Sequence, residues 1–293
     1  MIGHLQTIAA ALAPRRRPAF VRERWETPDG DFIDVDFAGA AGRPLVLFHG
    51  LEGCSRSHYA SVLVPAFAHD GWRVAVPHWR GCSGEPNRLP RAYHSGDSTE
   101  VDWILGRFTP PVDAIGVSLG GNALLKWLGE RGEHARRIVR RAAAISAPLD
   151  LAAAAGALDR GLNRLLYTRM FLATLKSKSL AQLARYPGLF DGARVARART
   201  FQEFDELYTA PLHGFRDAAH YWSSSSSGAW LAHIRVPTLV INARNDPFLP
   251  EPALLAASRA AASSVTLEFP RAGGHVGFAA GWLTRRLGDF LRP

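Results

Sequence analysis

Cysteine is scarce in this sequence: its 293 residues include only two, Cys54 and Cys82. Their positions beside glycine-rich turns match neither a disulfide framework nor a zinc site. This scarcity excludes a small scaffold held together by disulfides and favours a reducing, cytoplasmic compartment. A chain of this length with 47% hydrophobic residues can bury a full core as one large α/β domain, with room for an inserted subdomain.

Long apolar runs are also missing, because no stretch approaches the length that spans a bilayer. Residues 8–13 are apolar, but Arg15, Arg16 and Arg17 follow them, whereas a secretory signal peptide carries its basic residues first. We therefore expect a soluble protein without a signal peptide. These observations leave room for a peripheral contact with a membrane.

Nucleic-acid recognition motifs are absent, although the formal net charge is +9 and the pI is near 10.2. The basic residues are mostly arginine and are scattered, so we interpret the charge as compositional bias. We interpret the one local cluster, residues 136–141, as the solvated end of a helix. We expect no nucleic-acid partner and assign no oligomeric state.

Short apolar runs alternate with helical patterns through most of the chain. A hairpin is expected around Pro28-Asp29-Gly30. The predicted strands comprise residues 21–25, 32–37, 45–48, 73–77, 113–117, 142–147, 238–242 and 265–269. The predicted helices comprise residues 57–71 with Ser57 as N-cap, 97–108 with a capping box from Asp97 to Glu100, 122–132, 252–262 and a last helix ending near Leu291. This pattern predicts an α/β fold with a mostly parallel sheet entered through an antiparallel hairpin.

The alternation of strands and helices stops between residues 148 and 232 and then resumes. This interval is helical in pattern and rich in Leu, Phe and Tyr, so we predict a helical cap there, inserted into an α/β core of residues 1–147 and 233–293. The serine run at residues 223–227 is interpreted as a linker at the end of the cap. Several apolar cap residues fit either an acyl-chain pocket or an ordinary cap core: Leu165, Leu166, Phe171, Leu172 and Leu175.

A serine between glycines lies where a buried strand turns into a helix, in Gly116-Val117-Ser118-Leu119-Gly120-Gly121. Such a corner strains the backbone, and glycine at positions 116 and 120 removes side-chain clashes across the turn. The corner lifts the Ser118 hydroxyl clear of the backbone, beside the positive end of the helix. The pattern also occurs in ordinary loops, but its strand and helix context indicates a nucleophile.

A nucleophilic serine needs a base and a carboxylate that orients the base. Asp246 and His275 each follow the carboxyl end of a predicted strand, as Ser118 does. Loops at these ends share one edge of a parallel sheet, so we expect the three side chains to converge. The order Ser, Asp, His is the order expected for α/β-hydrolases.

An acyl-transfer site also needs donors for the oxyanion. The candidates are the backbone N–H groups of Leu119, next to the nucleophile, and of Leu51, in the loop after the strand at residues 45–48. We interpret His49 as a structural residue that orders this loop. His58, His78 and His94 lack a carboxylate or cysteine at metal-ligand spacing and are interpreted as ordinary histidines.

Several linked motifs together resemble the YheT-like branch of the α/β-hydrolase superfamily. They are residues 3–8, His49-Gly50-Leu51-Glu52-Gly53, residues 78–87, Tyr93-His94-Ser95-Gly96, the Ser118 corner, Asn245-Asp246-Pro247-Phe248 and residues 273–278. The resemblance implies a serine hydrolase, with relatives that act on short- to medium-chain acyl esters or lipids, or that transfer acyl groups to alcohols. Asn245 departs from the family, which usually has a second aspartate there. The cap matches least clearly.

We therefore predict a carboxylic ester hydrolase that uses Ser118, His275 and Asp246, with no metal or organic cofactor. Its partner would be a small acyl ester or a lipid ester. Two alternatives stay open at this point: an acyltransferase that passes the acyl group to an alcohol, and a hydrolase-fold binding protein without catalysis.

Overall fold

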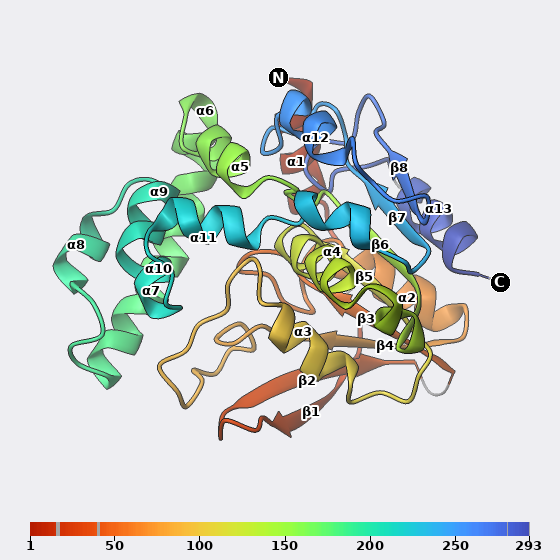
Figure 1. Cartoon of the computed structure of the whole chain (residues 1–293), viewed down its shortest axis with the longest axis horizontal. Coiled ribbons are helices and arrows are strands. Elements are labelled where there is room, and N and C mark those ends of the chain that lie inside the picture. Colours follow the sequence, from red (N-terminus) through yellow and green to blue (C-terminus); the bar gives the residue numbers. More distant parts are fainter. Residues whose placement is uncertain (16–17, 40–41, 280, 293) are drawn as a thin grey trace.

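The computed structural model describes residues 1–15, 18–39, 42–279 and 281–292, and within them helices cover both faces of an eight-stranded sheet (Figure 1). The strands are β1 (Val21–Glu26), β2 (Phe32–Ala38), β3 (Arg43–Phe48), β4 (Trp72–Pro77), β5 (Val112–Val117), β6 (Val139–Ile145), β7 (Thr238–Ile241) and β8 (Val265–Glu268). Their order is β1-β2-β4-β3-β5-β6-β7-β8. β2 is antiparallel to β1 and β4, and the other neighbours are parallel. The predicted fold class is confirmed.

The helices of the core precede and follow a long helical segment. Before it come α1 (Ile2–Leu12), α2 (Ala60–His69), α3 (Ser98–Leu105), α4 (Leu119–Arg131) and the 3-10 helix η1 (Gly132–Arg137). After it come α12 (Glu251–Ser258) and α13 (Trp282–Leu291). Within the described residues, none of these or the remaining helices is long and apolar enough to cross a membrane.

The strands β3 to β7 are largely buried on both faces, which explains their apolar runs, whereas β1 at the edge of the sheet is mostly exposed. In β3, Val46 and Phe48 point into the core formed with α3 and α4. Leu45 and Leu47 point into the opposite core, formed with α2 and α13. Consecutive side chains of a strand alternate between the two faces, so each face receives every second residue.

Residues 148–232, the predicted cap, are helical, and residues 151–225 lie to one side of the sheet (Figure 1). Residues 228–232 instead pack against α4, and Leu231 belongs to the core of the sheet. The helices of residues 148–232 include α5 (Leu151–Leu158), α6 (Gly161–Asn163), η2 (Arg164–Thr168), α7 (Arg169–Arg185), α8 (Gly192–Arg197), α9 (Phe201–Phe204), η3 (Asp205–Thr209), α10 (Ala210–Leu212), α11 (Ala218–Ser225) and most of η4 (Gly228–His233). Of these, η2 and η3 are π-helical. The division into core and cap stays a prediction.

Two predicted helix caps differ in the structure. The second helix begins at Ala60, because the Ser57 hydroxyl accepts a hydrogen bond from Cys54 N–H (3.0 Å) and stabilises a turn instead of capping a helix. The predicted capping box of α3 is half formed. Asp97 accepts from Glu100 N–H at 3.3 Å, but the Glu100 carboxylate turns away to bind Arg80.

The serine run is not a linker. Ser223 to Ser225 end α11, and Ser225 and Ser227 are buried. The Asn122 amide donates to Ser225 O and accepts from Ser227 N–H, at 2.8 and 2.9 Å. A Cβ atom on Gly96 would lie 2.6 Å from Ser225 Cβ, so close packing requires small residues here. The linker interpretation was wrong because composition cannot separate a flexible serine run from a tightly packed one.

The basic cluster at residues 136–141 is likewise not one helix end. The chain leaves η1 at Arg137 and enters β6 at Val139. Arg140 donates two hydrogen bonds to the buried Asp113 carboxylate, at 3.0 and 2.8 Å, and Arg141 donates to Arg292 O. These arginines attach the C-terminal helix to the sheet.

Candidate active site

The Ser118 corner connects β5 directly to α4. Ser118 has φ 52° and ψ −120°, a left-handed conformation that costs a non-glycine residue on the order of 1–3 kcal/mol. A Cβ atom on Gly116 would lie 2.5 Å from Gly120 O, and one on Gly120 would lie 2.4 Å from Phe48 O. Both glycines are therefore required for the corner to close, as the sequence predicted.

The three sequence-predicted side chains meet at this corner. Ser118 Oγ lies 3.0 Å from His275 Nε2, and His275 Nδ1 lies 2.8 Å from Asp246 Oδ2. Because a carboxylate only accepts, Nδ1 carries the proton and Nε2 is free to accept from the serine hydroxyl. The loops after β5, β7 and β8 supply one residue each, at the carboxyl edge of the parallel strands.

Asp246 and His275 are held in one orientation. The Asp246 side chain is fully buried, and its second oxygen accepts from Phe248 N–H at 2.8 Å. The Phe248 ring stacks on the His275 imidazole, with the ring centres 4.2 Å apart. These contacts leave the imidazole little freedom to turn away from the serine.

The N-terminal helix α1 supports the loop that carries His275, a role that sequence reasoning missed. Thr7 Oγ1 accepts from His275 N–H at 2.8 Å, and Gln6 Oε1 accepts from Gly273 N–H at 3.1 Å. Asn245 donates to Gln6 Oε1 (2.8 Å) and accepts from Gly274 N–H (3.0 Å). An aspartate at residue 245 would only accept, so the asparagine suits a position between a donor and an acceptor. The signal in the sequence was a pair of polar residues, Gln6 and Thr7, inside an apolar stretch.

The loop after β3 faces the serine. Three of its N–H groups are occupied: Gly50 N–H donates to Tyr59 Oη, Glu52 N–H to Tyr93 Oη and Gly53 N–H to Gly50 O. Within the described residues, the N–H of Leu51 has no acceptor. The N–H of Leu119, at the first turn of α4, has none either. These are the two predicted oxyanion donors, and both residues line the same cavity as Ser118.

A contact from the helical segment holds this loop. Glu52 has a positive φ of 52°, and its carboxylate accepts at 2.9 Å from both Tyr93 Oη and Lys178 Nζ. Lys178 belongs to α7, so the ion pair joins the predicted cap to the residue beside Leu51. Nothing in the spacing of Glu52 and Lys178 along the chain indicated this pairing.

His49 is structural, as interpreted from the sequence. It is fully buried; its Nε2 accepts from Trp79 N–H (3.1 Å) and its Nδ1 donates to Gly50 O (2.9 Å). Burial lowers the pKa of His49 to about 3, so the ring stays neutral at physiological pH. It orders the loop before Leu51 without reaching the serine.

The other three histidines that were interpreted as ordinary have ordinary contacts. His78 binds the Asp36 carboxylate at 2.9 Å. His94 packs its ring against His213, with the ring centres 4.7 Å apart. His58 lies 3.4 Å from Val276 O, and burial lowers its pKa to about 4.

A cavity of about 860 Å³ opens above the serine, between the sheet edge and the helical segment. One part of its wall is apolar and comes from α1, α5 and α7, including Ile8, Leu158 and Phe171. Of the apolar cap residues singled out in the sequence, Phe171 and Leu175 line the cavity, whereas Leu172 lies in a separate core and Leu165 and Leu166 are exposed.

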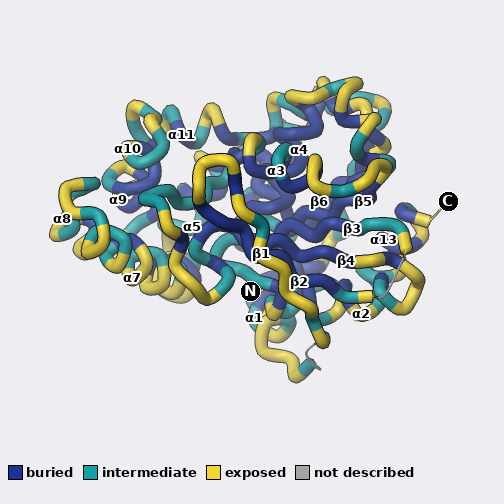
Figure 2. Tube along the Cα trace, turned by 90° about the horizontal axis from the view of Figure 1, so that it is seen from below, coloured by how far each residue is buried: buried dark blue, intermediate teal, exposed yellow. Residues whose placement is uncertain are grey.

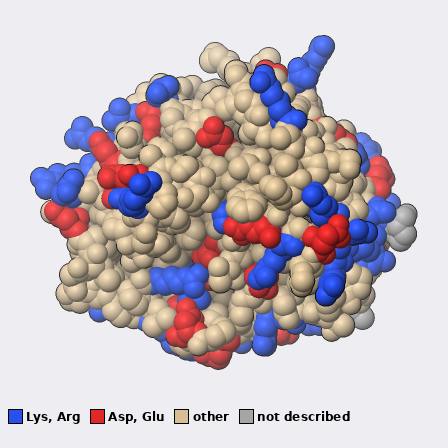
Figure 3. All heavy atoms as spheres, in the orientation of Figure 1, with Lys and Arg blue, Asp and Glu red and all other residues tan. Residues whose placement is uncertain are grey.

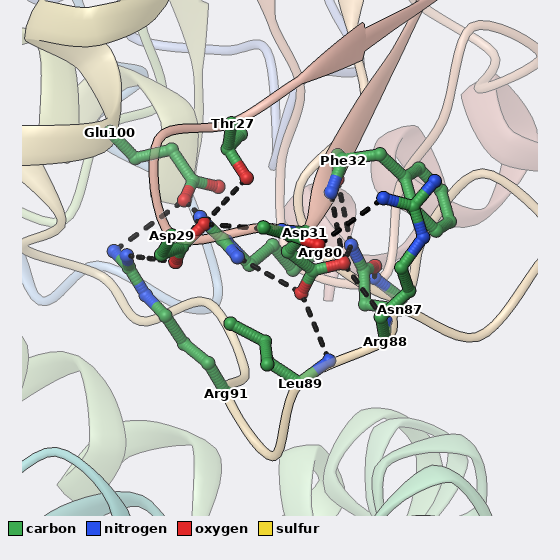
Figure 4. A network of polar contacts seen from close by, with 12 residues as sticks. Thr27, Asp29, Asp31, Phe32, Arg80, Asn87, Arg88, Leu89, Arg91 and Glu100 are labelled. Atoms are coloured by element: carbon green, nitrogen blue, oxygen red, sulfur yellow. Dashed lines mark hydrogen bonds and ion pairs between the residues drawn. The ribbon is translucent and has the colours of Figure 1, made fainter.

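The polar part of the cavity wall is held by a buried ion-pair network (Figure 4). Arg80 donates to Asp31 at 3.0 Å and to Glu100 at 2.7 Å, and Asn87 donates to Asp31 at 2.9 Å. Burial, followed by the nearby Asp97 charge, raises the pKa of Glu100 to about 7. The network attaches the loop at residues 80–91, which lines the cavity, to the hairpin turn and to α3.

Basic and acidic side chains lie close together on one face of the molecule (Figure 3). On the face drawn in Figure 3, basic and acidic side chains alternate around a broad area that carries neither.

The chain is similar to known proteins over most of its length. A family model described as the alpha/beta hydrolase fold matches residues 43–281. "Putative esterase YheT" of Escherichia coli (strain K12) is 39% identical over 98% of this chain and 89% of its own length. Phospholipase ABHD3 of Mus musculus is 28% identical over 94% of this chain and 71% of its own length.

Solved structures agree on the fold. A hydrolase from Pseudomonas aeruginosa PA01 superposes with a TM-score of 0.60 and 21% identity, covering 93% of this chain and 98% of the other. The esterase EaEST from Exiguobacterium antarcticum gives a TM-score of 0.59 with 17% identity, again over 93% and 98% of the two chains. At these identities the likeness concerns the fold alone.

Proposed function

The chain belongs to the α/β-hydrolase fold family, in the branch that includes YheT, and from that premise we propose that it is a serine carboxylic ester hydrolase. The observation that carries the proposal is the hydrogen-bonded series from Ser118 through His275 to Asp246, at 3.0 and 2.8 Å. The cavity of about 860 Å³ above Ser118, partly apolar, suits acyl esters or lipid esters.

In the proposed reaction, Ser118 Oγ attacks the ester carbonyl while His275 Nε2 takes the hydroxyl proton. Asp246 stabilises the imidazolium that forms. The N–H groups of Leu51 and Leu119 stabilise the tetrahedral oxyanion. The carbon–oxygen bond to the alcohol then breaks, and the alcohol leaves with the proton from His275. Water attacks the resulting acyl-enzyme by the same route and releases the acid.

The decisive test compares Ser118→Ala with Ser55→Ala, a matched control. Ser55 also lies beside an aspartate and a histidine, but its hydroxyl does not contact the histidine. Hydrolysis of p-nitrophenyl acyl esters should fall by about 10³-fold or more in Ser118→Ala, because the residual rate comes from binding and the oxyanion donors alone. Ser55→Ala should keep its activity.

Labelling by a fluorophosphonate gives a second readout of the same comparison. The wild-type protein and Ser55→Ala should both be labelled, and Ser118→Ala should not. Hydrolysis or labelling retained in Ser118→Ala would overturn the assignment of the nucleophile. Folded wild-type protein that neither labels nor hydrolyses any ester would instead favour the binding protein without catalysis.

Acyl transfer to an alcohol is the second candidate function. The medium-chain fatty acid ethyl ester synthase/esterase 2 of Saccharomyces cerevisiae is 30% identical over 69% of this chain and 51% of its own length. An alcohol can replace water in the second half of the proposed reaction without any change in the residues used. Product analysis with ethanol present would separate the two functions, since a transferase forms the ethyl ester and a hydrolase the free acid.

A further inference from the structure

Apolar side chains are concentrated on one part of the surface. Eight of the eleven large apolar residues that are exposed among the described residues lie on two adjacent segments. They are Met1, Ile2, Leu5 and Leu12 around α1, and Leu162, Leu165, Leu166 and Met170 from α6 to the start of α7. We call these eight residues the apolar face. A concentration of this kind on a soluble protein usually marks an interaction surface.

The two segments are in contact with each other. His4 of α1 stacks on Tyr167 of η2 with the ring centres 5.8 Å apart, and the two side chains lie 3.3 Å apart at His4 Nδ1 and Tyr167 Oη. Ile8 of α1 packs against a buried apolar cluster that contains Tyr167. Figure 2 shows exposed residues along both α1 and α7. The two helices therefore present one joined surface.

Folding does not account for the apolar side of α1. Gly3 and Thr7 are the buried residues of this helix, and they pack against the loops that carry Asn245 and His275. At about 100° per residue, Ile2, Leu5 and Leu12 project away from that side. Leu5 is 67% exposed. The exposed apolar side of α1 is removed from water only when a partner outside the chain covers it.

The charge around the apolar face identifies its partner. Residues 1–22 and residues 160–190 contain no aspartate or glutamate, whereas Arg160, Arg164 and Arg169 are exposed beside the apolar residues. A symmetric dimer through this face would bring these arginines together with no acidic residue of the same segments to neutralise them. The surface of a bilayer that contains anionic lipids supplies both an apolar layer and negative charge.

The apolar face also reaches the cavity. Leu12 and Met170 are exposed and at the same time line the cavity that contains Ser118. We propose that the apolar face docks on anionic membrane surfaces and holds the mouth of the cavity against the lipid. The delivery of lipid-dissolved esters to Ser118 rests on the proposed function, but the docking itself does not.

Vesicle binding tests the docking directly. The probe is co-sedimentation of the full chain, in a Ser118→Ala background, with vesicles of phosphatidylcholine alone or mixed with phosphatidylglycerol. We expect binding to the mixed vesicles that weakens as salt is raised, and little binding to phosphatidylcholine alone. No hydrolysis is required, so a failure of the proposed function would leave this result unchanged.

Two variants and one matched control locate the surface. Ile2→Gln/Leu5→Gln/Leu165→Gln should lower the vesicle partition coefficient by about tenfold or more. The matched control Val21→Gln/Val62→Gln/Leu255→Gln changes the three exposed apolar residues outside the face and should bind as wild type. Arg164→Gln/Arg169→Gln should lower partition about 25-fold, at about fivefold for each arginine near an anionic surface.

Three results would overturn the proposal. One is wild-type protein that does not bind the mixed vesicles, and another is unchanged binding in both the apolar-face glutamine variant and the arginine variant. The third is a concentration-dependent dimer, seen by sedimentation velocity, that the glutamine variant on the apolar face dissociates; the face would then be an interface between two copies. The side chains substituted to locate the surface are all exposed, and the arginine variant repeats the test without altering any apolar residue.

Discussion

Among the residues that the structure describes, serine, histidine and aspartate side chains meet at two places, with different connections. In the proposed triad of Ser118, His275 and Asp246, the histidine lies in the middle and touches both partners. In a second cluster, the Asp36 cluster, the aspartate lies in the middle. Asp36 accepts from Ser55 Oγ at 2.5 Å, from His78 at 2.9 Å and from Arg22 at 2.7 and 2.9 Å.

The two clusters contain the same residue types, so the types alone do not make a serine a nucleophile. What matters is whether the serine contacts the histidine or the aspartate. Ser55 donates its proton to a carboxylate already neutralised by Arg22, and Asp36 separates it from His78, so no base can take that proton. Ser118 Oγ instead lies 3.0 Å from His275 Nε2, on a strained corner that opens into a cavity. One arrangement suits acyl transfer, and the other stabilises the packing of β1, β2 and the loop after β3.

Asp246→Asn should have the largest effect on this comparison. The amide can donate to His275 Nδ1, which favours the tautomer with its proton on Nε2, and that nitrogen could no longer accept from Ser118. We expect kcat for acyl-ester hydrolysis to fall by about 10³-fold or more, with thermal unfolding measured alongside. A loss smaller than about tenfold would show that Asp246 does not orient the histidine.

Asp36→Asn should instead cost stability. Burial alone would raise the pKa of Asp36, but hydrogen bonds from Arg22, His78 and Ser55 outweigh it and hold the pKa well below its usual range. Removing the charge leaves a buried histidine and an arginine without their anion, so the free energy of unfolding should fall by about 3 kcal/mol at pH 7. Activity per folded molecule should be retained.

The pH dependence of that loss follows from the lowered pKa of Asp36. A carboxyl with a lower pKa in the folded state stabilises the fold above its unfolded pKa of about 3.9, and this contribution decreases as pH falls below that value. The difference between wild type and Asp36→Asn in denaturant unfolding should therefore shrink from pH 7 to pH 3. A difference that stays constant over this range would contradict the charged role of Asp36.

Lys178→Met should have the smallest of these effects. Lys178 bonds Glu52, which adjoins the proposed oxyanion donor Leu51, so losing the ion pair should loosen that donor and lower kcat by about tenfold. Lys176→Met is the matched control on the same helix, because Lys176 donates to Ala196 O and Ala198 O and does not contact Glu52. Equal activity in the two variants would show that the helical segment does not position this loop.

Local pattern predicted much of the fold. The buried strands, the hairpin, the Ser118 corner and the Asp97 cap each depend on a few neighbouring residues, and the structure has all of them. The errors at the serine run and at residues 136–141 share one cause. In both places a partner distant in sequence decides the conformation, as Asn122 does for Ser225 and Asp113 does for Arg140. The error at Ser57 is local, because its hydroxyl accepts from the nearby Cys54 N–H in a turn.

The sequence by itself determined the elements of the sheet and which residues follow its strand ends, because strand periodicity and the glycine corner are set within a few residues. Only the tertiary structure decided which serine contacts a histidine, that α1 supports His275 and that Lys178 reaches Glu52. These contacts join residues that are 126 to 268 positions apart. Such pairs form only when the whole sheet and the helical segment are in place, so no local pattern encodes them.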